Sequence, residues 1–174
     1  MTTSVIGSVL NADTYSETPG NRKAIVCAGC YVPITGEDTN EDTVGTLLND
    51  ASPKNFEALY YQTTPVVCRL GEFAVDVHVD AVSTQRPTVS VALAIIADNA
   101  GDGYTVVKYL TRNTYSLFGG GGASDDLPTE NVPQFVLSAG QNLAVIVFNS
   151  LPEAAGDDTC VAAVSVNGTV YYTQ

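Results

Sequence analysis

The amino-acid sequence predicts an all-β protein, an antiparallel β-sandwich of jelly-roll type that carries an N-terminal arm. Two observations predict this fold: apolar and polar residues alternate with the period of a β-strand, and turn residues separate the alternating segments. We count about eight to ten such segments, as expected for a sandwich. The chain has 174 residues, of which 45% are hydrophobic, so one domain with a substantial core can form.

The chain divides into an arm, residues 1–21, and a single sandwich domain, residues 22–174. The arm is polar and ends just after Pro19-Gly20. It contains one small apolar cluster, made of Val5, Ile6, Val9 and Leu10. Because this cluster has no evident strand partner in the sandwich, we expect these four residues to form an interface with another chain. The arm has no basic region followed by a long apolar core, so it does not resemble a secretory signal.

The first half of the sandwich contains the clearest strands. In Phe73–Asp80, four apolar residues alternate with Asp76, His78 and Asp80, which predicts a half-buried antiparallel strand. Val89–Ile96 is apolar on both faces and is expected to lie centrally in its sheet, with Tyr104–Leu110 as its partner. Only Thr43–Leu48 and Pro53–Leu59 have a pattern that one or two helical turns would fit.

The last third follows the same pattern. Strands are expected at Phe135–Leu137, Leu143–Phe148, Thr159–Val166 and Thr169–Tyr172, and Asn167-Gly168 predicts a tight hairpin between the last two. Three segments are predicted to be long surface loops: Gly36–Asp50, Gly119–Pro133 and Pro152–Asp158.

Charge limits the classes of partner. The net charge is −12, from 19 acidic and 7 basic residues, and this negative field disfavours nucleic acid and anionic membrane surfaces. No segment reaches the ~20 apolar residues of a membrane span. Only 15% of residues are charged. Either partners bury part of the surface, or abundant Ser, Thr, Asn and Gln cover it.

The residue types that could carry catalysis are present, but their patterns are typical of solvated polar side chains. His78 is the single histidine, it alternates with acids on a polar strand face, and no Gly-x-Ser-x-Gly motif is present. The acidic pairs Asp125-Asp126 and Asp157-Asp158 are assigned to loops, where the rigid placement that glycosidases need is absent. We therefore expect that the protein is not an enzyme.

Metal and cofactor binding are not expected. Cys27 and Cys30 form a C-x-x-C motif, but it lies in a predicted strand, where positions i and i+3 face opposite sides. Together with Cys68 and Cys160, these residues are expected to be buried free thiols. Calcium at the acidic segments 37–42 and 98–102 is an alternative, although neither segment matches an EF-hand.

Two segments resemble small β-sandwich structural proteins of tailed phages. Gly20–Val26 is similar to the first strand of such proteins, and Phe135–Val145 is similar to the strand, Gly-Gln, strand turn of jelly-roll head-decoration and fibre-base proteins. The resemblance implies a virion protein that stabilises a capsid from outside as a homotrimer. It would be made in the host cytoplasm, and its partners would be its own copies and the major capsid protein or another virion protein. A lectin-like or receptor-binding adhesion module is the alternative, since nine tyrosines but no tryptophan are available for sugar stacking.

Overall fold

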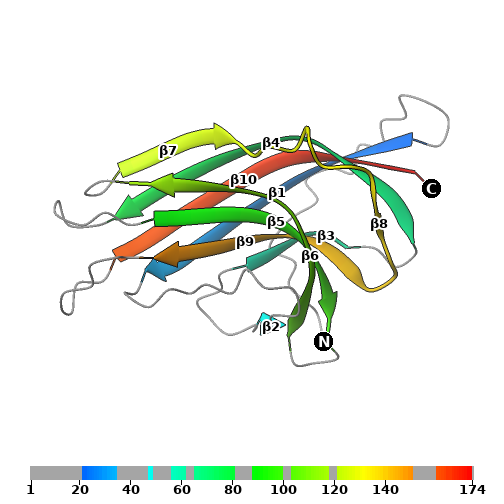
Figure 1. Cartoon of the computed structure of the whole chain (residues 1–174), viewed down its shortest axis with the longest axis horizontal. Coiled ribbons are helices and arrows are strands. Elements are labelled where there is room, and N and C mark those ends of the chain that lie inside the picture. The colour runs from blue at the N-terminus through cyan, green and yellow to red at the C-terminus, as the bar shows by residue number, and fades with distance from the viewer. Residues whose placement is uncertain are drawn as a thin grey trace.

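The computed structural model describes residues 21–34, 47–48, 56–61, 65–80, 88–99, 103–117, 121–150 and 160–173. These residues form ten β-strands in two antiparallel sheets, and none of them is helical (Figure 1). The all-β prediction is therefore confirmed. The apolar cluster of the predicted arm lies outside the described residues, and the first strand begins at Asn21.

The first sheet, called sheet A here, contains the two ends of the described chain. Its strands lie in the order β1-β10-β4-β7, and the short strand β8 pairs with β4 beyond the end of β7. Their bounds are β1 Asn21–Ile34, β10 Cys160–Thr173, β4 Val66–Asp80, β7 Gly121–Asp126 and β8 Phe135–Leu137.

The second sheet, sheet B, has the order β2-β6-β5-β9-β3. When the short strands β2 and β8 are set aside, each sheet contains four strands, and the chain crosses repeatedly between the two sheets. This order is that of the eight-stranded jelly roll. The bounds are β2 Leu47–Leu48, β6 Tyr104–Ser116, β5 Thr88–Asp98, β9 Gln141–Ser150 and β3 Phe56–Tyr61.

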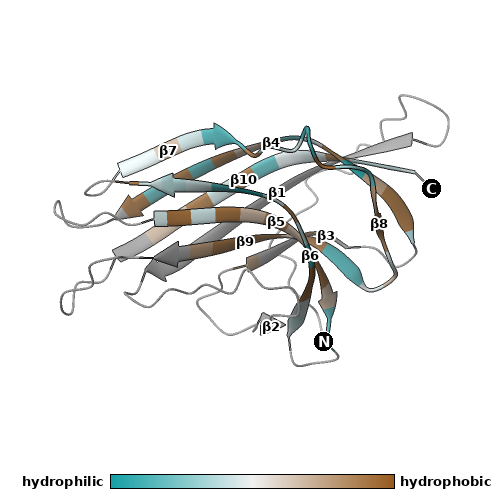
Figure 2. Ribbon diagram, viewed as in Figure 1, coloured by the Kyte–Doolittle hydropathy of each residue, from teal (hydrophilic) through white to brown (hydrophobic). Residues whose placement is uncertain are grey.

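The predicted alternation on β4 is confirmed. Phe73, Val75, Val77 and Val79 are buried, whereas Asp76 and His78 are exposed on the outer face. Figure 2 shows the resulting bands of hydrophobic and hydrophilic residues along this strand. The main core therefore lies between the two sheets, where the inward residues of β4 and β10 meet those of β5 and β9.

A β-bulge divides β4 into two halves, and the numbering of the buried positions changes from even to odd across it. Before it the buried positions are even-numbered, as at Cys68 and Leu70, and after it they are odd-numbered, beginning with Phe73. The register with β10 shifts here, because Phe73 pairs with Gly168 while Leu70 pairs with Val170. The extra residue keeps both halves facing the same core, since a shift of one residue would otherwise reverse every side chain.

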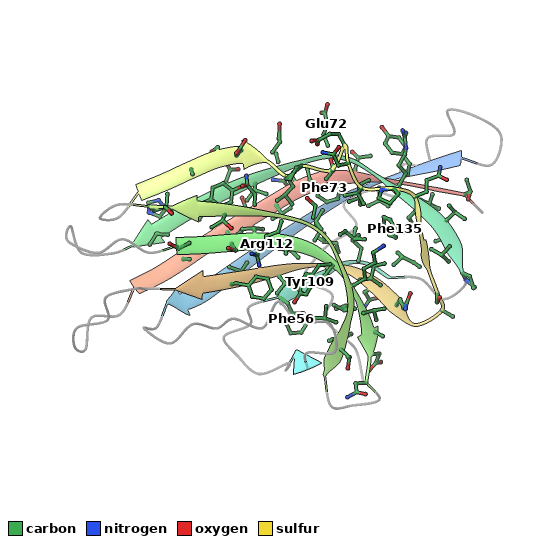
Figure 3. All side chains as sticks on the ribbon, viewed as in Figure 1. Phe56, Glu72, Phe73, Tyr109, Arg112 and Phe135 are labelled. Atoms are coloured by element: carbon green, nitrogen blue, oxygen red, sulfur yellow. The ribbon has the colours of Figure 1, made fainter. Side chains whose placement is uncertain are left out.

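The Phe73 ring occupies the space beside the β10 backbone. A Cβ atom added to Gly168 would lie 2.3 Å from Cδ1 of Phe73, far closer than any carbon contact allows. Figure 3 shows Phe73 directed into the sandwich while its neighbour Glu72 points outward. Glycine at position 168 is thus explained by the close approach of a ring, and the predicted hairpin at Asn167-Gly168 is wrong: β10 continues through both residues.

Sheet B is apolar on both of its faces near the middle. Val91 and Leu93 of β5 face the main core, and Ala92 and Ala94 between them belong to a second buried cluster on the outer side. The central position predicted for this strand is confirmed, since β5 lies between β6 and β9. The other members of the second cluster are Phe56, Ile96, Val106, Ala144, Ile146 and Phe148.

Polar side chains join the edge of one sheet to the edge of the other. On β6, the Asn113 amide Nδ2 donates hydrogen bonds to Asp125 Oδ2 of β7 (3.1 Å) and to the Tyr115 hydroxyl (3.3 Å). The Thr111 hydroxyl donates to the backbone carbonyl of Pro128 (2.9 Å). Burial raises the pKa of Tyr115, and the negative charge of Asp125 raises it further, so this hydroxyl stays protonated beside the acid.

Three other local predictions are corrected. Leu47–Leu48 and Phe56–Tyr61 are strands where helical turns were considered, because their backbones pair with β6 and β9. Gly121–Asp126, predicted as part of a long loop, is strand β7, which pairs with β4 from Ala74 to Val79. The segments 36–46 and 152–158 lie outside the described residues.

Candidate interaction surface

The outer face of sheet A exposes a pair of valines on adjacent strands. Val67 of β4 and Val136 of β8 are directly opposite each other, and they are 40% and 53% exposed. Among the described residues, Val107 is the only other large hydrophobic side chain with comparable exposure. Thr173 of β10 lies directly opposite Val67 on the other side, which extends this surface across three strands.

An arginine–tyrosine contact borders the two valines. Arg69 and Tyr171 are cross-strand neighbours, and the guanidinium carbon lies 4.8 Å from the centre of the tyrosine ring. This distance fits a cation–π interaction. Arginine and tyrosine are enriched in the cores of protein interfaces, where charged residues in general are depleted. We call the five residues Val67, Val136, Arg69, Tyr171 and Thr173 the β8 patch.

Strand β8 is an edge strand that is held firmly at both ends. Among the described strands, it pairs only with β4. The segment before it is anchored on the β4 bulge by the Leu127 N–H, which donates to the Phe73 carbonyl (2.8 Å), and by the Thr129 hydroxyl, which donates to the Gly71 carbonyl (2.7 Å). An edge of this kind offers unpaired backbone groups to another strand.

The turn after β8 is equally defined. Gly140 adopts φ = 79°, a conformation that favours glycine. The Gln141 side chain accepts a hydrogen bond from the Ser138 N–H (2.9 Å), and the Gln141 N–H donates to the Ser138 carbonyl (3.0 Å). The predicted turn at Ala139-Gly140 is confirmed, and it fixes how the β8 patch is presented.

Acidic residues lie farther along sheet A, on β4 and β7. Asp76 accepts a hydrogen bond from the Ser124 hydroxyl on β7, and Asp126 is exposed on the same strand. The prediction that Asp125 and Asp126 lie in a loop is wrong, since both belong to β7. The strand neighbours of His78 are Gly122 and Ala163, so neither cross-strand residue supplies a hydroxyl or a carboxylate.

The candidate metal ligands are only partly described. Within the ranges given above, no group of three His, Cys, Asp or Glu side chains is placed to hold a metal ion. Asp98 and Asn99 of one calcium candidate are described, but residues 100–102 and the whole acidic segment 37–42 lie outside the described residues. Asp157 and Asp158 also lie outside them.

Of the four cysteines, Cys68 is described with its side chain. It is a free thiol, 1% exposed, as predicted. The β1–β10 register pairs Cys27 with Asn167, which is exposed, and Cys30 with Val164, which is buried, so the two partners lie on opposite faces of sheet A.

Burial also makes the Cys68 thiol a weak acid, with its pKa raised to about 11. In an unfolded chain the thiol ionises near 8.5. Because the folded pKa is the higher one, the thiol contributes stability that is complete below about pH 8.5 and is lost as the pH rises toward about 11. We expect the wild type to lose more stability between pH 8 and 10.5 than Cys68→Ala, measured by urea unfolding. The tyrosines titrate in both proteins, so their effect on stability cancels in the comparison. Equal losses of stability in the wild type and in Cys68→Ala would therefore contradict this prediction.

Comparisons with known proteins give similarities of shape at low sequence identity. No family model and no curated protein matches the chain. An aminopeptidase from the marine sediment archaeon Thaumarchaeota archaeon aligns with 97% of this chain and 36% of its own, at 12% identity and a TM-score of 0.45. The chain thus spans about a third of that enzyme.

Several other similar structures are of viral proteins. The decameric BFDV capsid protein aligns over 88% of this chain and 99% of its own, with 10% identity and a TM-score of 0.36. A mud crab tombus-like virus protein aligns over 95% and 94%, with 9% identity and a TM-score of 0.38. The described part of the chain has no helix that could cross a membrane.

Sequence reasoning missed the β8 patch. Val67 stands in the apolar run Val66-Val67-Cys68, which suggests a wholly buried segment, yet every second residue of a strand faces outward. The charged Arg69 two positions later was the available signal, since it shares a face with Val67. The predicted interface residues Val5, Ile6, Val9 and Leu10 lie outside the described residues, so their role stays a prediction.

Proposed function

We propose that this protein is a virion structural protein that assembles with copies of itself and binds the outside of a protein shell. In its most specific form, the proposal is a capsid decoration protein of a tailed phage, a homotrimer without catalytic activity or cofactor. It would be made in the host cytoplasm and reside in the virion.

The β8 patch is the observation that carries this proposal. An exposed valine pair, an arginine–tyrosine contact and a strand edge with no second partner among the described strands meet at one end of sheet A. Because the two valines are 40% and 53% exposed, completing their burial against a partner contributes about half of the full-burial value, roughly 0.7–1.5 kcal/mol each. In a closed symmetric oligomer, each copy would bury its patch against a neighbouring copy, so that no such apolar patch stays exposed.

The architecture and the charge agree with this role without deciding it. Jelly rolls form viral capsid domains as well as lectin domains, so the fold leaves both functions open. The net charge of −12 on a chain with few charged residues keeps the free surface soluble. The basic Arg69 in the patch is an exception that suits an acidic or aromatic group on a partner.

One candidate for the adhesion alternative, among the side chains that the structure describes, is the outer ring of the Tyr171-Tyr172 doublet. Tyr172 is buried in the main core, so only Tyr171 lies on the outer face. Its ring already stacks against Arg69, and a Cβ on Gly71 would meet the Tyr171 ring at 3.0 Å. One ring face is therefore occupied by the protein itself, which favours packing over sugar stacking.

The test adds purified protein to phage heads made without it. We expect saturable binding, counted as copies per head after sedimentation. We also expect a higher temperature of head disruption, because a protein that binds only the intact shell stabilises it. At a hundredfold excess over Kd this stabilisation is about 2.7 kcal/mol per site. A Val67→Asp, Val136→Asp double variant should bind more weakly, and Ser165→Asp on an exposed part of the same sheet should not. Tight glycan binding without binding to heads would favour adhesion and reject the proposal.

A further inference from the structure

Four residues from four strands lie in one row across the end of sheet A. The register pairs Val136 with Val67, Val67 with Thr173, and Thr173 with Asn21. Asn21 is the first residue of β1, so the preceding segment is attached to the sheet in the same row as the exposed valines. Figure 1 shows β8, the start of β1 and the end of β10 at the same end of the molecule.

We propose that the N-terminal segment of a neighbouring copy adds a strand to the open edge of β8, with its apolar residues packed on the β8 patch. The inference rests on the proposed self-assembly and names the segment that performs it. The segment is residues 5–10, Val-Ile-Gly-Ser-Val-Leu, in which three of six residues are β-branched aliphatics. Such residues favour strands.

The pattern of this segment matches both sides of the edge. In a strand, Val5 and Val9 share one face, while Ile6 and Leu10 share the other. One pair can thus contact the exposed Val136, and the other can extend the inward face beside Phe135 and Leu137, which are buried. The backbone of β8 offers hydrogen bonds to the added strand, a common way in which peptides bind sheets.

The length of the connection permits exchange between copies. Three strand spacings separate Asn21 from Val136, about 14 Å. Residues 11–20 join Leu10 to Asn21, and ten extended residues reach about 33 Å. This reach is long enough for the molecule's own β8 and for the β8 edge of an adjacent copy within about 33 Å, and the proposed self-assembly favours the second. Exchange of identical segments is an established route to symmetric oligomers.

Crosslinking between two different chains tests the exchange directly. A full-length Val136→Cys protein with a size tag is mixed in turn with full-length Val5→Cys and Ile6→Cys proteins, one from each face of the segment; each mixture is oxidised, and the products are separated without reductant. We expect a disulfide-linked heterodimer, because only contact between copies can join the two variants. Pairing the same two segment variants with Ser165→Cys is the matched control, since Ser165 is exposed on sheet A away from the patch, and wild-type mixtures report crosslinks through the native cysteines.

The outcomes separate this inference from the function. A heterodimer with Val136→Cys and none with Ser165→Cys supports exchange; no heterodimer, or equal yields from both, overturns it. A single chain carrying both cysteines that closes only on itself also overturns it. Val136→Asp, at a position 53% exposed, should fold normally by circular dichroism yet weaken self-association at least about tenfold by sedimentation. Binding to heads without exchange would leave the proposed function standing, and exchange without binding to heads would reject only the shell role.

Discussion

Replacing Phe73 with alanine should lower the free energy of unfolding by about 3–5 kcal/mol, the usual cost of removing a buried aromatic ring. Phe73 is 0% exposed and follows the bulge at which β4 changes parity. The bulge fixes the backbone on either side, so neighbouring side chains have little freedom to fill the cavity. Urea denaturation followed by far-UV circular dichroism measures the change.

The matched control for Phe73 is its exposed neighbour. Glu72→Ala lies on the outer face of the same bulge and should change stability by no more than about 0.5 kcal/mol. A loss below about 1 kcal/mol for Phe73→Ala would show that the ring is not packed as described.

Gly168→Ala should lower the free energy of unfolding by about 1–3 kcal/mol, although alanine is otherwise well tolerated in place of glycine. The added Cβ would lie 2.3 Å from the Phe73 ring, so the ring or the β10 backbone must move. Ser165→Ala, three residues earlier and exposed, is the control and should be nearly neutral.

A double-mutant cycle identifies the cause. In Phe73→Ala, Gly168→Ala the ring is absent, so the new methyl group finds space and the two losses should not add. A double variant that loses the full sum would show that Gly168 is required for another reason, such as backbone conformation, and would refute the steric cause.

Local pattern predicted most of the fold because the sandwich has one dominant core. The alternation on Phe73–Asp80 and the two-sided apolar run of β5 were predicted correctly, since each depends only on which faces are buried. The prediction at Asn167-Gly168 failed because glycine after asparagine also suits a tight turn. The glycine is required there by a ring from a different strand, Phe73, which no local pattern contains.

Strand β7 shows a second limit of local pattern. The segment Gly121–Asp126 consists of small and acidic residues with low strand propensity, and it is extended because β4 supplies its hydrogen-bond partners. The β8 patch was missed for a related reason. Val67 and Val136 are neighbours only through the β4–β8 register, and their exposure depends on where sheet A ends.

The buried outer cluster on sheet B has a consequence for orientation. Ala92, Ala94 and Ile146 are fully buried on the side of this sheet that faces away from the main core, so the middle of that face cannot be touched by another molecule. Sheet A has exposed side chains along its outer face, on β4 from Val67 through Glu72 to Asp76 and His78. Among the described residues, sheet A therefore has the outer face that is exposed in its middle, and the carboxylates of Glu72 and Asp76 lie to one side of the two valines along it. A partner that contacts both the valines and these carboxylates can bind in a single direction only.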